Sequence, residues 1–409
     1  MKISGKATKE GTQRYRERHL KNCHQTFFNE VGELTLSSLG IGTYNNRLED
    51  HSLGLVTKAI EESIRSGINM IDSAICYAQE KAECSIRDGI RNLLELGEVS
   101  RDELVICTKG GVLPHPKENH VECVEWFAQN YVEPSRFSID ENDLVNTAYC
   151  MHPEYLQDQL DRSLVNLGVE TIDIYYIHNP EVQLLKFAPD VFYDQLRKAF
   201  EVMEDAVASG KIGAYGLATW RGFRLSPTSK RYLDLQKIKS IAQEVAATRN
   251  KKDKFQFIQL PINMIMLEAL VLPTQKIDGE AVSILEAASR LNIFPVASNS
   301  IDRQRLNKKV PKHIFSDFDN NLKTDYQRKL QYTRSTPHLS SALVGMTKME
   351  HVRENLALKK ISSIEKKKFF KITRLIERSL LFHHSFKTFF HYITTILTGI
   401  GTPLKSLTR

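Results

Sequence analysis

Short apolar runs alternate along the chain with longer segments in which apolar residues recur every three or four positions. An uninterrupted apolar run is typical of a strand buried on both faces of a parallel sheet, and the longer period is typical of a helix with one buried face. The runs predict strands near residues 39–43, 68–72, 104–108, 172–177, 213–218, 256–260, 293–298 and 341–345. The periodic segments predict helices near residues 52–66, 80–96, 153–167, 190–209, 230–248, 279–291, 318–333 and 348–359.

Eight strands that alternate with eight helices predict a (β/α)8 TIM barrel, in which all strands are parallel. Glycine follows three of the predicted helices where a C-cap is expected, at Gly67, Gly168 and Gly210. The structural alternative, a doubly wound open sheet, would need a G-x-G-x-x-G turn after the first strand. Residues 40–44 read Gly-Ile-Gly-Thr-Tyr and do not supply that turn.

Two connections are too long to be plain loops. Residues 111–152 follow the third strand and residues 299–317 follow the seventh. Both would leave the same end of the barrel, where loops commonly form the walls or lids of a substrate pocket. The alternative for the first connection is a disordered insertion, but Trp126, Phe127 and Tyr131 make it more aromatic than disorder favours.

Composition adds limits on class and compartment. The chain has 409 residues, 41% of them hydrophobic and 26% charged, as in an ordinary soluble globular protein. The N-terminus lacks the apolar core of a secretory signal, and no stretch of 18 uninterrupted apolar residues exists. Six cysteines without a C-x-x-C pair indicate reduced thiols, and we therefore expect a cytoplasmic protein.

The net charge of +7 lies in the last part of the chain. Residues 361–409 hold nine lysines and arginines against two glutamates, which accounts for the whole net charge. A nucleic-acid-binding barrel would carry its basic residues in the folded body, so we expect no nucleic-acid partner.

The two ends of the chain differ in pattern from the body. Residues 1–30 are polar, basic and without periodicity, so we expect a flexible arm before a barrel over 31–360. Residues 361–409 contain a lysine run at 366–368 and then an apolar stripe, which predicts a basic amphipathic helical extension. Its apolar face either packs on the barrel or contacts an anionic membrane surface or a partner. The stripe consists of Phe382, Phe386, Phe389, Phe390, Ile393, Ile396 and Leu397.

Four polar residues stand at or just beyond the ends of predicted strands. Asp72, Lys109 and His178 each end an apolar run, and Tyr77 follows Asp72 by five residues. Each alone would be an ordinary cap, loop or strand-end residue. The carboxyl ends of all strands of a parallel barrel open on one face, so we expect the four to meet there. A carboxylate, a phenol, an ammonium and an imidazole at one mouth predict a site for proton transfer.

These residues lie in segments that resemble the signatures of the aldo-keto reductases. The segments are residues 72–77, 107–111 and 177–181, together with Gln259 and the pair at 354–355. The resemblance covers roughly residues 35–358 and keeps the order and spacing of the motifs. It implies a (β/α)8 barrel that reduces an aldehyde or ketone to an alcohol, or the reverse, with hydride from a nicotinamide cofactor. The partner it implies is a small carbonyl or alcohol substrate.

The resemblance also assigns roles to the four residues. Hydride addition to a carbonyl leaves an alkoxide that needs a proton, and Tyr77 would supply it. A phenol has a pKa of about 10 in water, and a nearby ammonium such as that of Lys109 lowers such a pKa. Asp72 would keep Lys109 charged, and His178 would hydrogen-bond and polarise the substrate oxygen.

The residues that would hold the nicotinamide amide are less complete. The family places a Ser-Asn pair after the fifth strand and a glutamine on the sixth. Gln259 matches the glutamine, whereas Ala218 and Thr219 stand at the pair, so only the hydroxyl of Thr219 remains. Ser298 stands where the family often has a tyrosine that stacks on the nicotinamide ring.

Residues 345–355 resemble the family's phosphate-binding turn and helix. Backbone N–H groups at a helix N-terminus suit a phosphate, and a lysine adds a point charge. The resemblance favours NADP(H) over NAD(H), although a histidine stands where many members have an arginine. The alternative is an ordinary capped surface helix. The residues that the resemblance assigns to this part of the cofactor are Gly345, Thr347, Lys348, His351, Glu354 and Asn355.

Two other interpretations stay open at this point. The altered nicotinamide clamp and the basic tail also suit a nucleotide-binding barrel that acts as a regulatory or scaffolding subunit with weak or no turnover. Cys76 beside Tyr77 and Cys107 near Lys109 are either redox-sensitive or inert buried thiols. The histidines at 383, 384 and 391 lack carboxylate or thiolate companions, so we expect no metal site.

Overall fold

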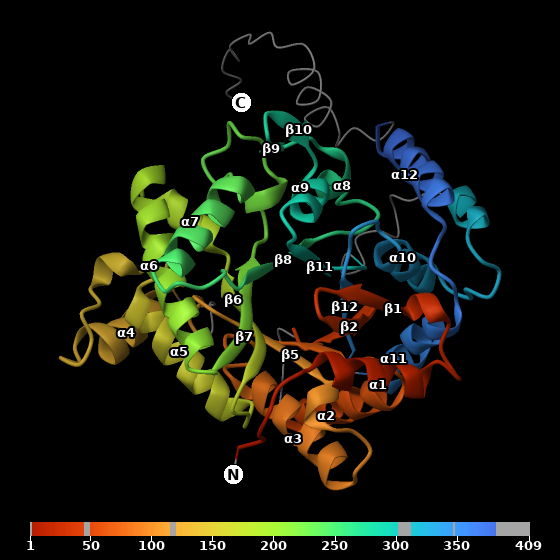
Figure 1. Cartoon of the computed structure of the whole chain (residues 1–409), viewed down its shortest axis with the longest axis horizontal. Coiled ribbons are helices and arrows are strands. Elements are labelled where there is room, and N and C mark those ends of the chain that lie inside the picture. Colours follow the sequence, from red (N-terminus) through yellow and green to blue (C-terminus); the bar gives the residue numbers. More distant parts are fainter. Residues whose placement is uncertain (1, 45–49, 115–119, 302–311, 347, 382–409) are drawn as a thin grey trace.

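The computed structural model describes residues 2–44, 50–114, 120–301, 312–346 and 348–381. Eight parallel strands close into a barrel in the order β11-β12-β3-β4-β5-β6-β7-β8, with helices around it (Figure 1). The predicted (β/α)8 architecture is confirmed. The barrel strands are β3 (Leu39–Gly42), β4 (Met70–Asp72), β5 (Val105–Gly110), β6 (Ile172–His178), β7 (Ile212–Ala218), β8 (Phe255–Pro261), β11 (Phe294–Ser298) and β12 (Ser341–Gly345).

The surrounding helices begin and end within a few residues of the predicted bounds in most cases. They are α2 (Asp50–Arg65), α3 (Lys81–Glu95), α5 (Pro153–Asn166), α6 (Pro189–Ala208), α7 (Leu235–Ala247), α9 (Ile284–Arg290), α10 (Asp325–Arg334) and α11 (Met349–Leu356). Two begin later than expected because capping residues set their starts. Asp234 accepts a hydrogen bond from the backbone of Lys237, and Thr324 forms a capping box with Gln327.

The helix expected over 279–291 is the least accurate of these predictions. Its first part belongs to a hairpin of β9 (Gln275–Ile277) and β10 (Glu280–Val282), which turns through Gly279 at a φ of 86°. The helix α9 begins only at Ile284, after Ser283 caps it. A short helix, α8 (Glu268–Val271), precedes the hairpin.

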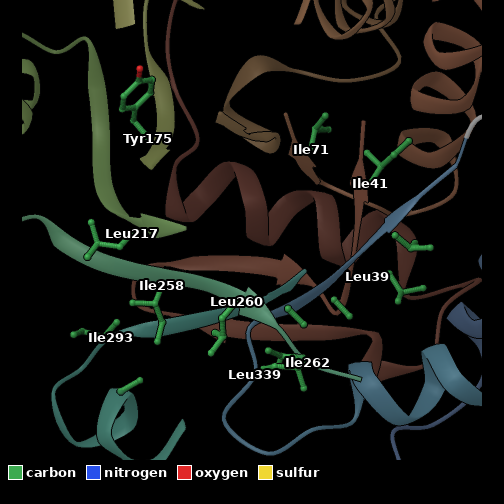
Figure 2. Packing of buried hydrophobic residues seen from close by; sticks show 14 of the residues in the cluster. Leu39, Ile41, Ile71, Tyr175, Leu217, Ile258, Leu260, Ile262, Ile293 and Leu339 are labelled. Atoms are coloured by element: carbon green, nitrogen blue, oxygen red, sulfur yellow. The ribbon is translucent and has the colours of Figure 1, made fainter. Parts of the chain in front are cut away.

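Alternate residues of each barrel strand face opposite sides, as the two-residue period of a strand requires. One set packs against the helices, and Figure 2 shows Ile71, Leu217 and Ile258 in this layer. The other set, which includes Met70 and Val105, fills the barrel interior. Because side chains pack on both faces of the barrel strands, the strand ends keep fixed positions relative to one another.

The first thirty residues differ from the expected flexible arm. They contain α1 (Lys9–His19) and β1 (Phe28–Val31), which pairs antiparallel with β2 (Leu34–Ser37). Tyr15 is fully buried, and its hydroxyl donates a hydrogen bond to the Ile68 carbonyl at 3.0 Å. The expectation of a flexible arm is wrong because the partners of this segment are distant in sequence, and a local pattern does not register them.

The β1–β2 hairpin covers one end of the barrel. Val31 and Leu36 belong to the cluster that fills the barrel interior, and Gly32 approaches the ring of Phe294, the first residue of β11. The hairpin therefore covers the end at which the strands begin. The long connections and the predicted site lie at the opposite end of the barrel, where the strands finish.

The described part of the long connection after β5, residues 111–114 and 120–152, is folded rather than disordered. It contains α4 (His120–Phe127), a turn of π-helix over 128–132 and a small apolar cluster that includes Phe127 and Tyr131. After β11, residues 302–311 lie outside the described part of the chain, and a 3-10 turn spans Lys312–Asp317.

The described part of the C-terminal segment forms α12 (Lys366–Leu381), which lies beside α10 in Figure 1. The ring of Phe369 stacks on Tyr332 with 4.6 Å between centroids, and Ile372 and Ile376 are buried. This part of the extension therefore packs on the barrel. The apolar stripe predicted beyond residue 381 lies outside the described residues. Within the described part of the chain, no helix combines the length and the apolar character needed to cross a membrane.

Candidate active site

A buried ion pair stands at the carboxyl ends of two neighbouring strands. Lys109 on β5 donates from Nζ to Oδ2 of Asp72 on β4 at 2.6 Å, and also to the carbonyl of Ser73. The other carboxylate oxygen of Asp72 accepts from the amide of Gln259 on β8 at 2.8 Å. Burial raises the pKa of Asp72, while Lys109 and Gln259 oppose that rise by stabilising the carboxylate.

Tyr77 follows in the loop after β4, half-buried above this pair. The Nζ atom of Lys109 lies 5.2 Å from the centroid of the Tyr77 ring. The loop is tied to β5 by backbone bonds, since the Ser73 N–H donates to the Cys107 carbonyl at 2.9 Å and the Ile75 N–H to the Lys109 carbonyl at 3.2 Å. The strand that carries Lys109 therefore also places the loop that carries Tyr77.

His178 completes the group at the end of β6. Its ring lies edge-on to the ring of Tyr77, with 6.1 Å between centroids and 80° between planes. It is half-buried, like Tyr77. The four residues predicted to meet at the mouth are thus brought together in space, two of them buried and two half-buried.

Two further residues line this group and were not among the predicted site residues. Tyr44, which follows β3, packs its ring edge-on against Tyr77 with 4.9 Å between centroids. Cys76 places its Sγ 3.8 Å from Nδ1 of His178. Tyr44 follows the end of the first strand by two residues, and that position on the mouth was the signal available in the sequence. Cys107 is buried, and burial raises its pKa well above the ordinary value.

The residues expected at the nicotinamide amide lie next to the ion pair. Thr219 follows β7, is 4% exposed, and donates its backbone N–H to the carbonyl of Gln259 at 2.8 Å. Its hydroxyl oxygen is buried and has no hydrogen-bond partner among the described residues. A buried hydroxyl of this kind fits a polar group such as an amide, so the residues present suit a nicotinamide at this end of the barrel. Ser298, at the end of β11, is half-buried.

The predicted phosphate-binding segment is only partly described. Lys348 and His351, at the start and middle of α11, are exposed, as is Gly345 at the end of β12. The carboxylate of Glu354 accepts a hydrogen bond from the hydroxyl of Thr324, the cap of α10. Asn355 is 5% exposed, and Thr347 lies outside the described residues.

Across the residues that the structure describes, no three or more His, Cys, Asp or Glu side chains gather in a way that could hold a metal ion. The histidines at 383, 384 and 391 lie beyond residue 381 and outside that range.

Comparison with known proteins supports the resemblance to the aldo-keto reductases. Residues 38–377 match the family described as the Aldo/keto reductase family. The uncharacterized oxidoreductase YqkF of Bacillus subtilis is 20% identical over 332 residues, covering 80% of this chain and 87% of that protein. A protein of Schizosaccharomyces pombe named as a putative voltage-gated potassium channel subunit beta is 22% identical over 354 residues, covering 82% of this chain and 88% of that protein.

Among solved structures, an aldo/keto reductase from Klebsiella pneumoniae in complex with NADP and acetate is similar in fold. It matches with a TM-score of 0.56 at 17% sequence identity, covering 84% of this chain and 93% of that chain. At this identity the likeness shows the barrel fold. Roles for individual residues therefore depend on the geometry of the site and not on this likeness.

Proposed function

The chain belongs to the aldo/keto reductase family, an NAD(P)H-dependent oxidoreductase family, and we propose that it reduces an aldehyde or ketone with NADPH and with Tyr77 as the proton donor. The observation that carries the proposal is the meeting of Asp72, Tyr77, Lys109 and His178 at one mouth. Either direction, reduction of the carbonyl or oxidation of the alcohol, uses the same groups.

The proposed mechanism follows from the charges at the mouth. A bound nicotinamide cofactor supplies the hydride. Tyr77 gives its phenolic proton to the substrate oxygen, and the ammonium of Lys109, 5.2 Å from the ring centroid, favours the phenolate that remains. Asp72 keeps that ammonium charged through the 2.6 Å contact. His178, whose ring lies edge-on to that of Tyr77, donates a hydrogen bond that orients the carbonyl oxygen.

For the cofactor, we assign the amide end to Thr219 and Gln259 and the phosphate end to α11. The unpartnered hydroxyl of Thr219 supports the first assignment. The exposed Lys348 and His351 at the start of α11 support an anionic group there, because a helix N-terminus and a lysine both favour phosphate. The preference for NADP(H) rests on the ammonium of Lys348 and on the imidazole of His351, which can hydrogen-bond a phosphate. We place the enzyme in the cytoplasm, since the six cysteines form no disulfide.

The experiment that tests the proposal is a comparison of wild type with Tyr77→Phe. A panel of aldehydes and ketones is presented with NADPH and separately with NADH, and cofactor oxidation is followed at the absorbance of the reduced nicotinamide. We expect Tyr77→Phe to lower kcat by roughly a hundredfold or more, since general acid catalysis contributes on the order of 10² to 10⁴. Binding of NADPH, measured by quenching of intrinsic fluorescence, should change little.

The matched control is Tyr193→Phe on α6, which lies on the outside of the barrel. It removes one phenolic hydroxyl from a half-buried position between outer helices and should leave kcat within about twofold of wild type, because this position is remote from the barrel mouth. If Tyr77→Phe retains wild-type turnover with a substrate that the enzyme reduces, Tyr77 is not the proton donor. Faster turnover with NADH than with NADPH would contradict the cofactor preference.

A second candidate function is that of a nucleotide-binding regulatory or scaffolding subunit. The similarity to the putative potassium channel beta subunit favours it, and so does Gln259, whose amide already bonds Asp72. This candidate predicts tight NADPH binding with no turnover on any carbonyl in the panel. Turnover that Tyr77→Phe abolishes would argue against it.

Residues 361–409 are proposed as a peripheral contact with an anionic membrane surface or a partner. The outward face of α12 is strongly cationic while its apolar face is covered by the barrel. Six exposed cations form this face, Lys366, Lys367, Lys368, Lys371, Arg374 and Arg378. Full-length protein should sediment with vesicles that contain phosphatidylserine and should lose that binding in a Lys367→Glu, Lys368→Glu double variant. Equal sedimentation of both proteins would contradict a membrane contact through this face.

A further inference from the structure

The turn that follows Tyr77 has an uncommon backbone conformation. Ala78, Gln79 and Glu80 have φ values of 49°, 54° and 72°, all in the left-handed region. Residues other than glycine adopt this region rarely, and three in succession persist only where the surroundings hold them. The Glu80 N–H donates to the Ile75 carbonyl at 3.0 Å, and α3 starts at the next residue. The turn therefore fixes where the chain leaves Tyr77.

The side chain of Glu80 is held from the neighbouring helix α5. One carboxylate oxygen accepts from the guanidinium of Arg162, and the other accepts from the amide of Asn166 at 2.9 Å. Arg162 and Asn166 are four residues apart, so they lie on one face of α5. Arg162 and Glu80 are 32% and 23% exposed, which leaves the contact partly shielded from water. We call Glu80 with these two partners the Glu80 clamp.

The Glu80 clamp is supported from two sides. The hydroxyl of Tyr131, in the long connection after β5, accepts from Arg162 at 3.0 Å and donates to Asp158 at 2.7 Å. The amide of Asn166 also donates to the buried Glu83 at 2.9 Å. Arg162 is therefore restrained by a folded insertion on one side and its own helix on the other. These contacts link the insertion to the turn beside Tyr77.

We infer that Arg162 is a positioning residue that keeps the left-handed turn, and with it the phenol of Tyr77, in place for proton transfer. The inference rests on the proposed role of Tyr77. Arg162 contacts Glu80, so its effect on Tyr77 would pass through Glu80 and the turn. A shift of a reacting group by about 1 Å can cost on the order of a hundredfold in rate, which sets the scale of the effect.

The test compares Arg162→Met with wild type, using full-length protein and the carbonyl substrate that wild type reduces best. We expect kcat to fall roughly tenfold to a hundredfold, while the Kd for NADPH stays within about twofold. The primary isotope effect with deuterated NADPH should increase, because the chemical step becomes slower than the other steps. Arg162→Lys keeps a cation at the position and should recover part of the lost kcat.

Two variants separate the clamp from backbone strain. Glu80→Gly removes the carboxylate but suits a φ of 72°, so it should lower kcat like Arg162→Met if the contact matters. The double variant of Arg162→Met with Glu80→Gln should be no slower than the slower single variant, because the two substitutions remove the same contact between Arg162 and Glu80. A Glu80→Gly variant with wild-type kcat would overturn the inference.

The matched control is Arg197→Met. Arg197 on α6 pairs with Glu244 on α7 at 2.6 Å and is 38% exposed, close to the exposure of Arg162, but it lies between two outer helices. If Arg162→Met lowers kcat no more than Arg197→Met does, while Tyr77→Phe abolishes turnover, the positioning role of Arg162 is overturned and the proposed function stands. If Tyr77→Phe retains turnover, the proposed function fails instead.

Discussion

The two halves of the barrel mouth are built differently. On the side of β4, β5 and β6, the predicted groups lie together and contact one another directly, from the 2.6 Å pair of Asp72 and Lys109 to the edge-on rings of Tyr77 and His178. On the side of β7, β11 and β12, where the cofactor is proposed to bind, Thr219 keeps a buried hydroxyl that has no hydrogen-bond partner among the described residues.

This difference is informative about how the site works. Groups that carry out proton transfer have to be placed before the substrate arrives, so their contacts are internal to the protein. Groups that bind a cofactor are completed by it, so a buried polar atom left unpaired fits a binding function. Substitutions on the first side should therefore change both stability and rate, and substitutions on the second should change mainly affinity.

The largest expected effect is that of Lys109→Met. Removing the ammonium leaves the carboxylate of Asp72 buried without its ion partner, which costs about 3–5 kcal/mol of unfolding free energy. Loss of the charge near Tyr77 should also lower kcat by roughly a hundredfold or more. Urea unfolding and steady-state kinetics with NADPH measure the two effects.

The control for this substitution is a second buried pair of the same kind. Lys239 on α7 contacts Asp253 at 2.6 Å, and the two side chains are 11% and 2% exposed. Lys239→Met should cost a similar unfolding free energy and leave kcat near that of wild type. A comparable loss of kcat in both variants would mean that the rate follows stability alone, and the comparison between the two sides would fail. Asp72→Asn, which keeps a polar partner, covers the case in which Lys109→Met does not fold.

The sequence predicted the strand side of this arrangement well. Each barrel strand is buried on both faces, so an uninterrupted apolar run marks it, and the residue at its end is then placed at the mouth by topology alone. Asp72, Lys109 and His178 were found in this way. Tyr77 was placed there only by following Asp72 by five residues, and its role came from the resemblance, because a tyrosine in a loop has no local signal of its own.

The parts that the sequence did not predict depend on contacts between distant segments. Three left-handed residues in a row without a glycine leave no turn signature, so the turn at 78–80 could not be predicted. Tyr15 is anchored by carbonyls some 50 residues away, at 64 and 68, and nothing in the polar composition of residues 1–30 reveals those partners. Arg162 was missed because it lies mid-helix, where an arginine is usually a solvated surface residue.

A second, smaller effect concerns pH and the buried carboxyl group of Glu83 on α3, which accepts a hydrogen bond from Thr108 of β5. Glu83 is fully buried, and burial raises its pKa from 4.5 to about 7, although the hydroxyl of Thr108 and the amide of Asn166 hydrogen-bond it. The folded protein thus binds this proton more tightly than the unfolded chain does. Its contribution to stability is fully present below pH 4.5 and is lost as the pH rises through 7.

The substitution that reports this linkage is Glu83→Gln. Relative to the variant, wild type should lose up to about 1.4 kcal/mol of unfolding free energy for each pH unit between 5 and 7, as one bound proton requires. Urea unfolding of both proteins at pH 5, 6, 7 and 8 measures the difference. Parallel stability profiles would show that Glu83 is ionised in the folded protein, and the network beneath β5 would then be charged rather than neutral.

The smallest effects are expected where the cofactor is proposed to bind, and there stability and NADPH affinity should change in opposite directions. Thr219→Val keeps the shape of the side chain and removes the unpartnered hydroxyl, so the protein without cofactor should become about 1 kcal/mol more stable. The same variant loses a hydrogen bond to the proposed nicotinamide, and its Kd for NADPH should rise roughly two- to twelvefold, as a bond of about 0.5–1.5 kcal/mol implies. Thr219→Ser retains the hydroxyl and should bind like wild type.

The sign pattern matters more than either magnitude. A rise in stability together with a loss of NADPH affinity would show that the hydroxyl of Thr219 is held unpaired for the cofactor, because only a partner that arrives from outside can repay its burial. Higher stability with unchanged affinity would instead place the nicotinamide elsewhere on the mouth. The nicotinamide contacts of this chain would then differ from those of the family in position as well as in number. Ala218, Thr219 and Ser298 would mark a nicotinamide site that has moved, and not one that has only lost contacts.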